Sequence, residues 1–201
     1  MLRWPVRIEA TTPAGEPVVL RSLEKRDERE YLSLRRANRD WLAPWEATSP
    51  WGPVSPVRFR ASLRQQAREV RAGRQLPLVI EARGQLVGQV TLFSITYGAM
   101  WGATAGYWIA EAAAGRGIMP TGLAAAVDHL VDEVGLHRIE VNIRPENTAS
   151  LAVVRKLGFR DEGVRERFLH IDGAWRDHRT FALVREDLGG RTLRSRLDEH
   201  G

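Results

Sequence analysis

Cysteine is absent from this chain of 201 residues. Its absence excludes disulfide bonds, thiolate-bound metals and a cysteine nucleophile. Histidine is scarce, and the five histidines form neither an H-x₃-H nor an H-E-x-x-H pattern; they stand at positions 129, 137, 170, 178 and 200. Protein metal sites are usually built from such closely spaced ligands, so we expect no metal site.

Long hydrophobic runs are missing as well. No apolar stretch reaches the roughly 20 residues of a membrane-spanning helix, and the N-terminal MLRWPVRIEA lacks the pattern of a signal peptide. We therefore expect a cytoplasmic protein that does not enter a membrane. The length and the hydrophobic content of 43% predict one domain, residues 1–188, followed by a polar, mobile tail, 189–201, that begins with Gly189 and Gly190.

Lysine is nearly absent, because only Lys25 and Lys156 are lysines among 30 basic residues. The net charge of +5 would suit a nucleic-acid partner. However, the arginines are scattered among acidic residues, as in the segment 24–36, and this mixture is typical of a solvated helix face. Direct binding of nucleic acid is therefore not favoured.

Alternating and helical hydrophobic patterns predict an α+β fold, with a mixed central sheet of about six to seven strands flanked by about four helices. The predicted strands are 17–22, 76–82, 86–95, 103–110, 137–143, 163–171 and 175–185. The predicted helices are 27–36 with Asp27 as N-cap, 55–72 starting at Ser55-Pro56, one from 117 onwards, and 148–157.

The stretch GYWIAEAAAGRGIMPTGLAAAVDHL, residues 106–130, is organised as a strand, a loop of small residues and a helix. A glycine-containing loop that leads into a helix N-terminus presents free N–H groups and the positive end of the helix dipole, which suits a phosphate. The same letters also fit a plain tight turn. Leu123 and Val127 mark the buried face of the predicted helix, with Asp128 among its polar positions.

Three tryptophans and three prolines crowd the segment 38–53. Trp41, Trp45 and Trp51 could be core residues between helices. Alternatively, they could line an aromatic-walled pocket for an acceptor molecule, where Glu46 would attract a cationic group.

Asn147 is typical of a helix N-cap, and Ser150 follows in the first helical turn. With 156–159, KLGF, they form the pattern N-x-x-S-x₅-K-L-G-F. Combined with the glycine loop upstream, this pattern resembles the GNAT acetyltransferase superfamily. The ending DGAWRDH, residues 172–178, is similar to the RimJ type, the ribosomal-protein-alanine N-acetyltransferases.

The resemblance implies a single GNAT-like domain that uses acetyl-coenzyme A (acetyl-CoA) as acetyl donor. It implies that the strand backbone at Trp108, Ile109 and Ala110 holds the pantetheine arm. Asn147 would also bind the pantetheine, and Ser150 would lie close to the thioester sulfur. The pyrophosphate would be held by loop amides, those of Ala113, Ala114, Gly115, Arg116, Gly117 and Ile118.

Two positions depart from the family pattern. Ala112 stands where the family loop usually has Gln or Arg, so we expect cofactor affinity to depend more on Arg116. Val154 stands where many relatives have a Tyr that protonates the leaving thiolate. Ser150 is then the candidate for that proton, and a strand amide near Ile109 is the candidate for stabilising the oxyanion.

Direct attack of an amine on the thioester, in a ternary complex, also requires a proton acceptor. The strand pattern places Glu140 and Asn142 on one face. The base candidates are Glu140, which could equally form a salt bridge, and a water ordered by Asn142 and Glu46.

The preferred acceptor is the N-terminal α-amine of a protein or peptide, with a ribosomal protein as one possibility. The alternatives are a small-molecule amine, a protein lysine, and a non-catalytic module that only binds acetyl-CoA. The sequence leaves the oligomeric state open.

Overall fold

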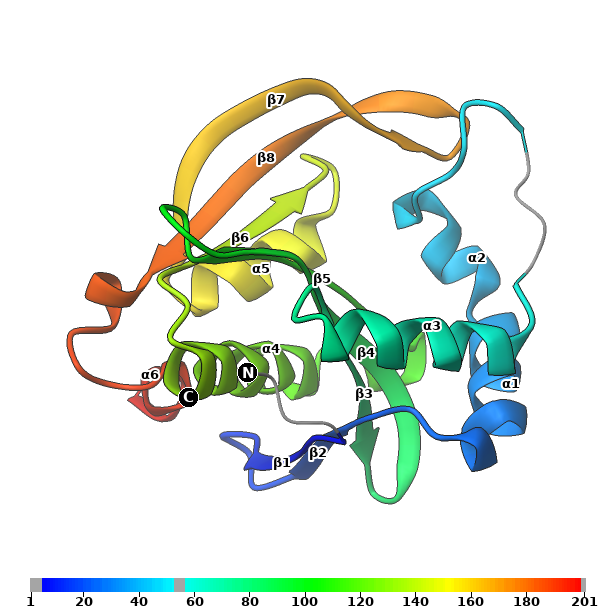
Figure 1. Ribbon diagram of the computed structural model, residues 1–201, viewed down its shortest axis with the longest axis horizontal. Coiled ribbons are helices and arrows are strands. Elements are labelled where there is room, and N and C mark those ends of the chain that lie inside the picture. The colour runs from blue at the N-terminus through cyan, green and yellow to red at the C-terminus, as the bar shows by residue number, and fades with distance from the viewer. Residues whose placement is uncertain (1–4, 53–56, 200–201) are drawn as a thin grey trace.

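An eight-stranded sheet runs through the protein in the computed structural model, which describes residues 5–52 and 57–199 (Figure 1). The strands lie in the order β1-β2-β3-β4-β5-β6-β8-β7, and every neighbouring pair is antiparallel except β5 and β6. They are β1 (Arg7–Thr11), β2 (Pro17–Arg21), β3 (Leu76–Ala82), β4 (Gln85–Thr96), β5 (Gly102–Ile109), β6 (Arg138–Ile143), β7 (Arg160–Ile171) and β8 (Ala174–Val184).

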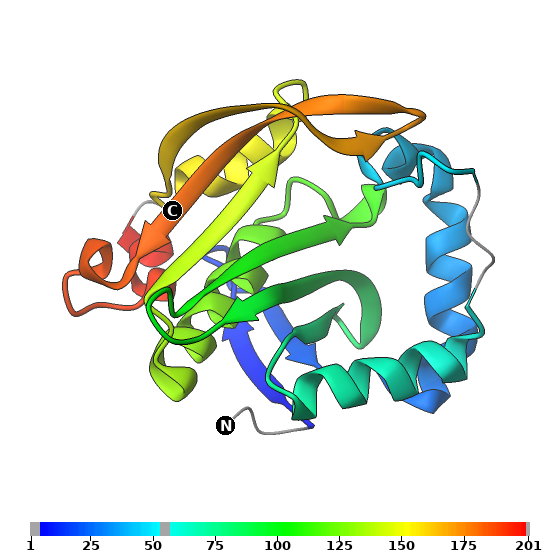
Figure 2. The same ribbon diagram turned by 45° about the horizontal axis from the view of Figure 1, so that its top comes forward.

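Helices cover both faces of this sheet. The main core lies on one face, where α4 (Ile118–His129) and α5 (Thr148–Lys156) pack on buried strand residues such as Val90, Leu92 and Val141 (Figure 2). On the other face, α1 (Glu28–Ala37) and α3 (Phe59–Arg71) pack over Val79 in a smaller apolar cluster. Two short helical segments, α2 (Arg39–Leu42) and η2 (Ala43–Trp45), continue from α1.

The strands β5 and β6 pair for only part of their length. Their parallel register covers Gly102 to Thr104 against Arg138 to Glu140, and beyond these residues both strands continue unpaired with each other. The carboxyl end of β5 therefore has one free edge. The glycine loop and α4 follow β5, while α5 follows β6, so both helix N-termini begin beside this opening.

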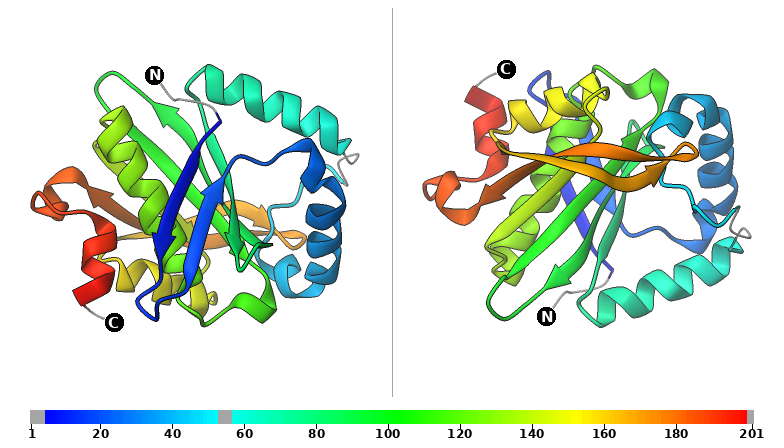
Figure 3. Two further views of the ribbon diagram at one scale, coloured as in Figure 1. Left: turned by 90° about the horizontal axis from the view of Figure 1, so that it is seen from below. Right: turned by 90° about the horizontal axis from the view of Figure 1, so that it is seen from above.

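The last two strands form a long ribbon that arches over the sheet towards α2, as the view from above shows (Figure 3). Its tip contacts the segment after η2 through the bridge between Ala47 and Ile171. The Thr48 N–H also donates to the His170 carbonyl at 2.9 Å. Two regions that are distant in sequence are thus joined across one face of the sheet.

The predicted class of fold is confirmed, although the predicted count of six to seven strands is one or two too low, since β1 was not among the predicted strands. Asp27 occupies the N-cap position of α1, but its buried carboxylate binds the Arg21 guanidinium and the Glu24 N–H instead of capping that helix. The predicted start at Ser55-Pro56 lies outside the described residues, and the described part of α3 begins at Phe59.

The prediction of a mobile tail from Gly189 is contradicted by a final helix, α6 (Leu193–Glu199). Leu193 and Leu197 are buried in the main core. Asp128 of α4, predicted as one of that helix's polar positions, is itself buried and accepts hydrogen bonds from the Leu193 and Arg194 N–H groups. This carboxylate compensates the free N–H groups at the start of α6.

Candidate active site

The free edge of β5 is formed by Tyr107 and Ile109. The Ala110 N–H donates to the Val87 carbonyl at 2.8 Å, so Ala110 faces β4. Because backbone groups alternate along a strand, Trp108 also faces β4, whereas Tyr107 and Ile109 face the opening. Of the three residues predicted to hold a pantetheine arm, only Ile109 therefore presents backbone groups at the open edge.

The loop after β5 turns twice through left-handed backbone conformations. Gly115 and Gly117 both have φ of +76°, and Gly117 is the N-cap of α4. Glycine is favoured at such angles because other residues would meet steric strain from their Cβ. The turn places the start of α4 against a cavity that Gly117, Ile118 and Met119 help to line. The first free N–H groups of a helix carry the positive end of its dipole.

This first cavity, the glycine-loop cavity, has a volume of about 350 Å³ and a largely apolar wall. It lies between the β5 edge, the loop with the start of α4, and α5. Five of the residues predicted for pyrophosphate contact line it, and Arg116 does not: the lining residues are Trp41, Tyr107, Ile109, Ala113, Ala114, Gly115, Gly117, Ile118, Met119, Pro120, Ala149, Ala152, Val153 and Lys156.

Arg116 points instead to Glu16, with which it forms an ion pair, and Glu16 also binds Arg83 at 3.0 Å. The Arg116 charge is therefore partly compensated, which weakens the expectation that cofactor affinity depends on Arg116. Lys156 lines the cavity with the glycine loop. Lys156 belongs to the K-L-G-F pattern, which by itself assigns it no role. Its charge in an otherwise uncharged motif is the signal that marks it.

At the start of α5, the predicted N-cap is confirmed, since the Asn147 side chain accepts a hydrogen bond from the Ser150 N–H at 3.0 Å. The Ser150 carbonyl accepts a hydrogen bond from the Tyr107 hydroxyl at 3.3 Å. Burial raises the pKa of Tyr107, so this phenol keeps its proton at neutral pH. In the sequence, Tyr107 lies within the predicted strand 103–110, and no motif singles it out.

A second cavity of about 210 Å³, the tryptophan cavity, opens on the other face of β5. Glu46 lines it and forms an ion pair with Arg35, whose guanidinium lies 4.8 Å from the centre of the Trp108 ring. The lining residues are Leu42, Trp45, Glu46, Gln89, Thr91, Gly106, Tyr107 and Trp108.

The three tryptophans of the segment 38–53 thus separate. Trp45 lines the tryptophan cavity, and Trp41 lines the glycine-loop cavity. Trp51 is 94% exposed and lines neither. Tyr107 lines both cavities, so two ligands bound in them would meet at this residue.

The two predicted residues of β6 line neither cavity. Glu140 is held between Arg138 at 2.9 Å and Arg165 at 3.2 Å, so the salt-bridge alternative describes it. Asn142 accepts a hydrogen bond from the Thr180 hydroxyl at 2.8 Å on the same sheet face as Trp108.

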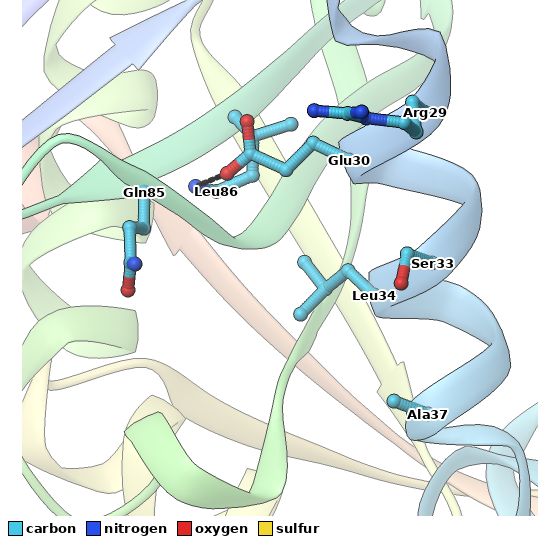
Figure 4. A pocket seen from close by; sticks show the side chains of 7 residues that line it. All are labelled: Arg29, Glu30, Ser33, Leu34, Ala37, Gln85 and Leu86. Carbon is cyan, nitrogen blue, oxygen red and sulfur yellow. Dashed lines mark hydrogen bonds between the residues drawn. The ribbon is translucent and has the colours of Figure 1, made fainter.

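A larger hollow of about 580 Å³ lies between α1 and the turn from β3 to β4 (Figure 4). Its wall includes Glu30, whose carboxylate accepts the Leu86 N–H at 2.7 Å. It shares no lining residue with the other two cavities, and no predicted site residue lines it.

Residues 5–52 and 57–199 contain no group of three or more His, Cys, Asp or Glu side chains placed to hold a metal ion. Within the same ranges, no helix combines the length and the apolar composition needed to cross a bilayer.

Comparison with known proteins identifies the class that this fold and site define. Residues 18–160 match the family model of the acetyltransferase (GNAT) domain. The chain belongs to the GNAT acetyltransferases, and it is an acetyl-CoA-dependent N-acetyltransferase of that family.

Its relatives are of the RimJ and RimL type. The chain is 32% identical over 175 residues to the probable N-acetyltransferase YjcK of Bacillus subtilis, covering 86% of this chain and 97% of the relative. It is 28% identical to the [ribosomal protein uS5]-alanine N-acetyltransferase of Escherichia coli, covering 85% of this chain and 89% of the relative. The structure of Mycobacterium smegmatis RimJ in complex with CoA-disulfide superimposes with a TM-score of 0.89 at 38% identity, covering 98% of this chain and 96% of the other.

Proposed function

We propose that this enzyme acetylates the N-terminal α-amine of a protein, with a ribosomal protein as the favoured substrate. The observation that carries the proposal is the tryptophan cavity, which meets the glycine-loop cavity at Tyr107. It is small, it is walled by Trp45 and Trp108, and its one carboxylate, Glu46, is paired with Arg35. A small space with aromatic walls suits the end of a peptide with a short first side chain.

On the donor side, the pantetheine arm pairs with the free edge of β5 at Tyr107 and Ile109, and Asn147 supplies a further amide partner. The pyrophosphate binds the loop amides from Ala113 to Ile118, supported by the helix dipole. The Lys156 ammonium adds a positive charge, because it lines the same cavity.

The reaction itself requires a neutral amine. An α-amine has a pKa near 8 and lysine one near 10.4, so at pH 7 about a tenth of the first but well under a thousandth of the second is neutral. Glu140 is already bound to two arginines, so no free carboxylate of β6 offers itself as a strong base. A site with weak bases is better suited to the α-amine.

The amine nitrogen then attacks the thioester carbon, and the electron pair of the breaking C–S bond goes to the sulfur. The proton that the amine loses ends on the coenzyme A thiol. Ser150 and Tyr107 are the candidate proton carriers, and the Tyr107 hydroxyl donates to the Ser150 carbonyl at the contact between β5 and α5.

The relatives support the same substrate class, since one of them carries the name of a uS5-alanine N-acetyltransferase. A ribosomal protein as substrate implies that the reaction takes place in the cytoplasm.

The test compares two peptides of otherwise equal sequence: one with a free N-terminal alanine and no lysine, the other with a blocked N-terminus and one lysine. We expect kcat/KM, measured as thiol release from acetyl-CoA, to be at least tenfold higher for the first. A better rate with the blocked peptide would identify a lysine acetyltransferase. Binding of acetyl-CoA without release with any peptide or small amine would indicate a non-catalytic module.

A further inference from the structure

Residues 38–48 form a strap between the two cavities, and its first part is bound to the end of β5. The Trp41 indole N–H donates to the Ile109 carbonyl at 3.0 Å. Asn38, which is buried, accepts a hydrogen bond from the Glu111 N–H at 2.9 Å, just before the glycine loop. Both contacts attach the strap to the segment that would hold the pantetheine arm.

The middle of the strap supplies one wall of the tryptophan cavity. Leu42, Trp45 and Glu46 line that cavity, only one to five residues after Trp41. Leu42 is the buried hydrophobic residue of this middle part, whereas Trp45 and Glu46 are partly exposed. The position of the wall therefore depends mainly on the points where the strap is attached.

The far end of the strap is attached to the other half of the chain. Arg144, which follows β6, donates to the Pro44 carbonyl at 2.7 Å, and its guanidinium lies 5.4 Å from the centre of the Trp45 ring. Thr48 is bound to His170 at the tip of the ribbon. The attachment through Trp41 is distinctive because the same side chain also lines the glycine-loop cavity.

We propose that Trp41 is a positioning residue that couples the two substrates. Its indole fixes the acceptor wall to the end of β5, and its ring forms part of the wall against which acetyl-CoA packs. Bound acetyl-CoA restricts the motion of the Trp41 indole, and the indole in turn restricts the motion of the strap. The acceptor then binds against a cavity wall that is already ordered. Binding of either substrate thereby favours binding of the other, and the coupling must be reciprocal.

This inference rests on the tryptophan cavity being the acceptor site, and it holds for any amine bound there. The Trp41 indole already donates to the Ile109 carbonyl. The pantetheine arm would therefore pair with the N–H and carbonyl of Tyr107 and with the Ile109 N–H.

The test uses Trp41→Phe, which keeps an aromatic ring but removes the N–H donor. The matched control is Trp51→Phe, since Trp51 is 94% exposed and lines neither cavity. We expect the acceptor KM of Trp41→Phe to rise about threefold to tenfold, the range for one lost hydrogen bond. The dissociation constant of acetyl-CoA alone should change by less than about twofold, because its packing surface is retained.

Two further readouts separate coupling from a general loss of structure. Coenzyme A should tighten acceptor binding in the parent enzyme and in Trp51→Phe, and this factor should approach one in Trp41→Phe. Backbone hydrogen exchange of residues 42–46 should slow on addition of acetyl-CoA in the parent and less so in Trp41→Phe. Trp41→Ala also removes the aromatic ring that lines the glycine-loop cavity, so it should in addition weaken the binding of acetyl-CoA.

The exchange measurement needs no acceptor, so it tests Trp41 even if the proposed α-amine substrate is wrong. Equal exchange protection and an equal coupling factor in Trp41→Phe and Trp51→Phe would overturn the role of Trp41. A failure of all peptides as substrates, together with the expected exchange difference, would overturn only the proposed acceptor.

Discussion

At the scale of single residues, substitutions of Gly117 can separate the effect of backbone geometry on acetyl-CoA binding from the effect of charge. Its φ of +76° disfavours side chains, but a Cβ built there lies no closer than 3.8 Å to Thr12, so space is not the obstacle. Asn and Asp tolerate left-handed backbone better than other residues. Gly117→Asp and Gly117→Asn therefore differ mainly in one negative charge at the proposed pyrophosphate site.

We expect Gly117→Asp to weaken acetyl-CoA by at least 100-fold, on the order of the repulsion between charges a few ångströms apart near a surface. Gly117→Asn should weaken it far less. Calorimetry measures both affinities, and circular dichroism checks that both variants are folded. Equal affinities of the two variants for acetyl-CoA would contradict the proposal that this loop binds the pyrophosphate.

Other residues show which signals in the sequence are sufficient to predict the position and contacts of a side chain. Asn147 was predicted as an N-cap from its place before a helical pattern, and this local role is what the structure shows. Glu140 was placed on the correct sheet face by alternation, but its partner Arg165 lies on β7 and pairs with it only through the tertiary fold. The position of Tyr107 between two cavities likewise depends on the tertiary fold, and no local sequence pattern predicts it.

At the scale of elements, α6 is the clearest failure of composition as a guide. A Gly-Gly pair and many charges indicated a mobile tail, yet two leucines one helical turn apart fill a gap beside α4. Leu197 is 2% exposed, and the buried Asp128 accepts the first N–H groups of the helix. A short helix of this kind is stabilised by packing more than by its own propensity.

If α6 is part of the folded domain, Leu197→Ala should lower the free energy of unfolding by about 2–3 kcal/mol, the usual cost of such a cavity near a chain end. The matched control is Leu32→Ala on α1, because Leu32 is 46% exposed and should cost well under about 1 kcal/mol. Urea unfolding measures both. If Leu197→Ala left the free energy of unfolding unchanged, residues 191–199 would be better described as the polar, mobile tail that the sequence predicts.

At the scale of the whole molecule, the buried His178 and the partly buried His129 make the stability of the fold depend on pH. Burial lowers the pKa of His178 below its ordinary value of 6.5, and nearby Arg144 acts in the same direction, whereas the Arg176 carbonyl, Glu146 and Asp177 oppose it. Burial likewise lowers the pKa of His129, against Glu133 and Asp132. The unfolded chain therefore binds these protons first as the pH falls.

The stabilising effect of keeping both rings neutral is complete above pH 6.5 and is lost below it. We expect the free energy of unfolding to fall as the pH drops below about 6.5. His178→Asn should reduce this slope, because an Asn amide can still donate to the Arg176 carbonyl but does not titrate. Urea midpoints at a series of pH values provide the test, and unchanged slopes in His178→Asn and in His129→Asn would contradict it.

The sequence by itself determined the class of fold, most strand and helix positions, the glycine loop and the Asn147 cap, because each depends on neighbours a few residues away along the chain. Only the tertiary structure decided that β5 and β6 separate after Thr104, that Lys156 and not Arg116 lines the glycine-loop cavity, and that Trp41 and Trp45 face different cavities. These features depend on contacts between segments far apart in the chain, and hydrophobic periodicity records which face is buried but not what that face meets.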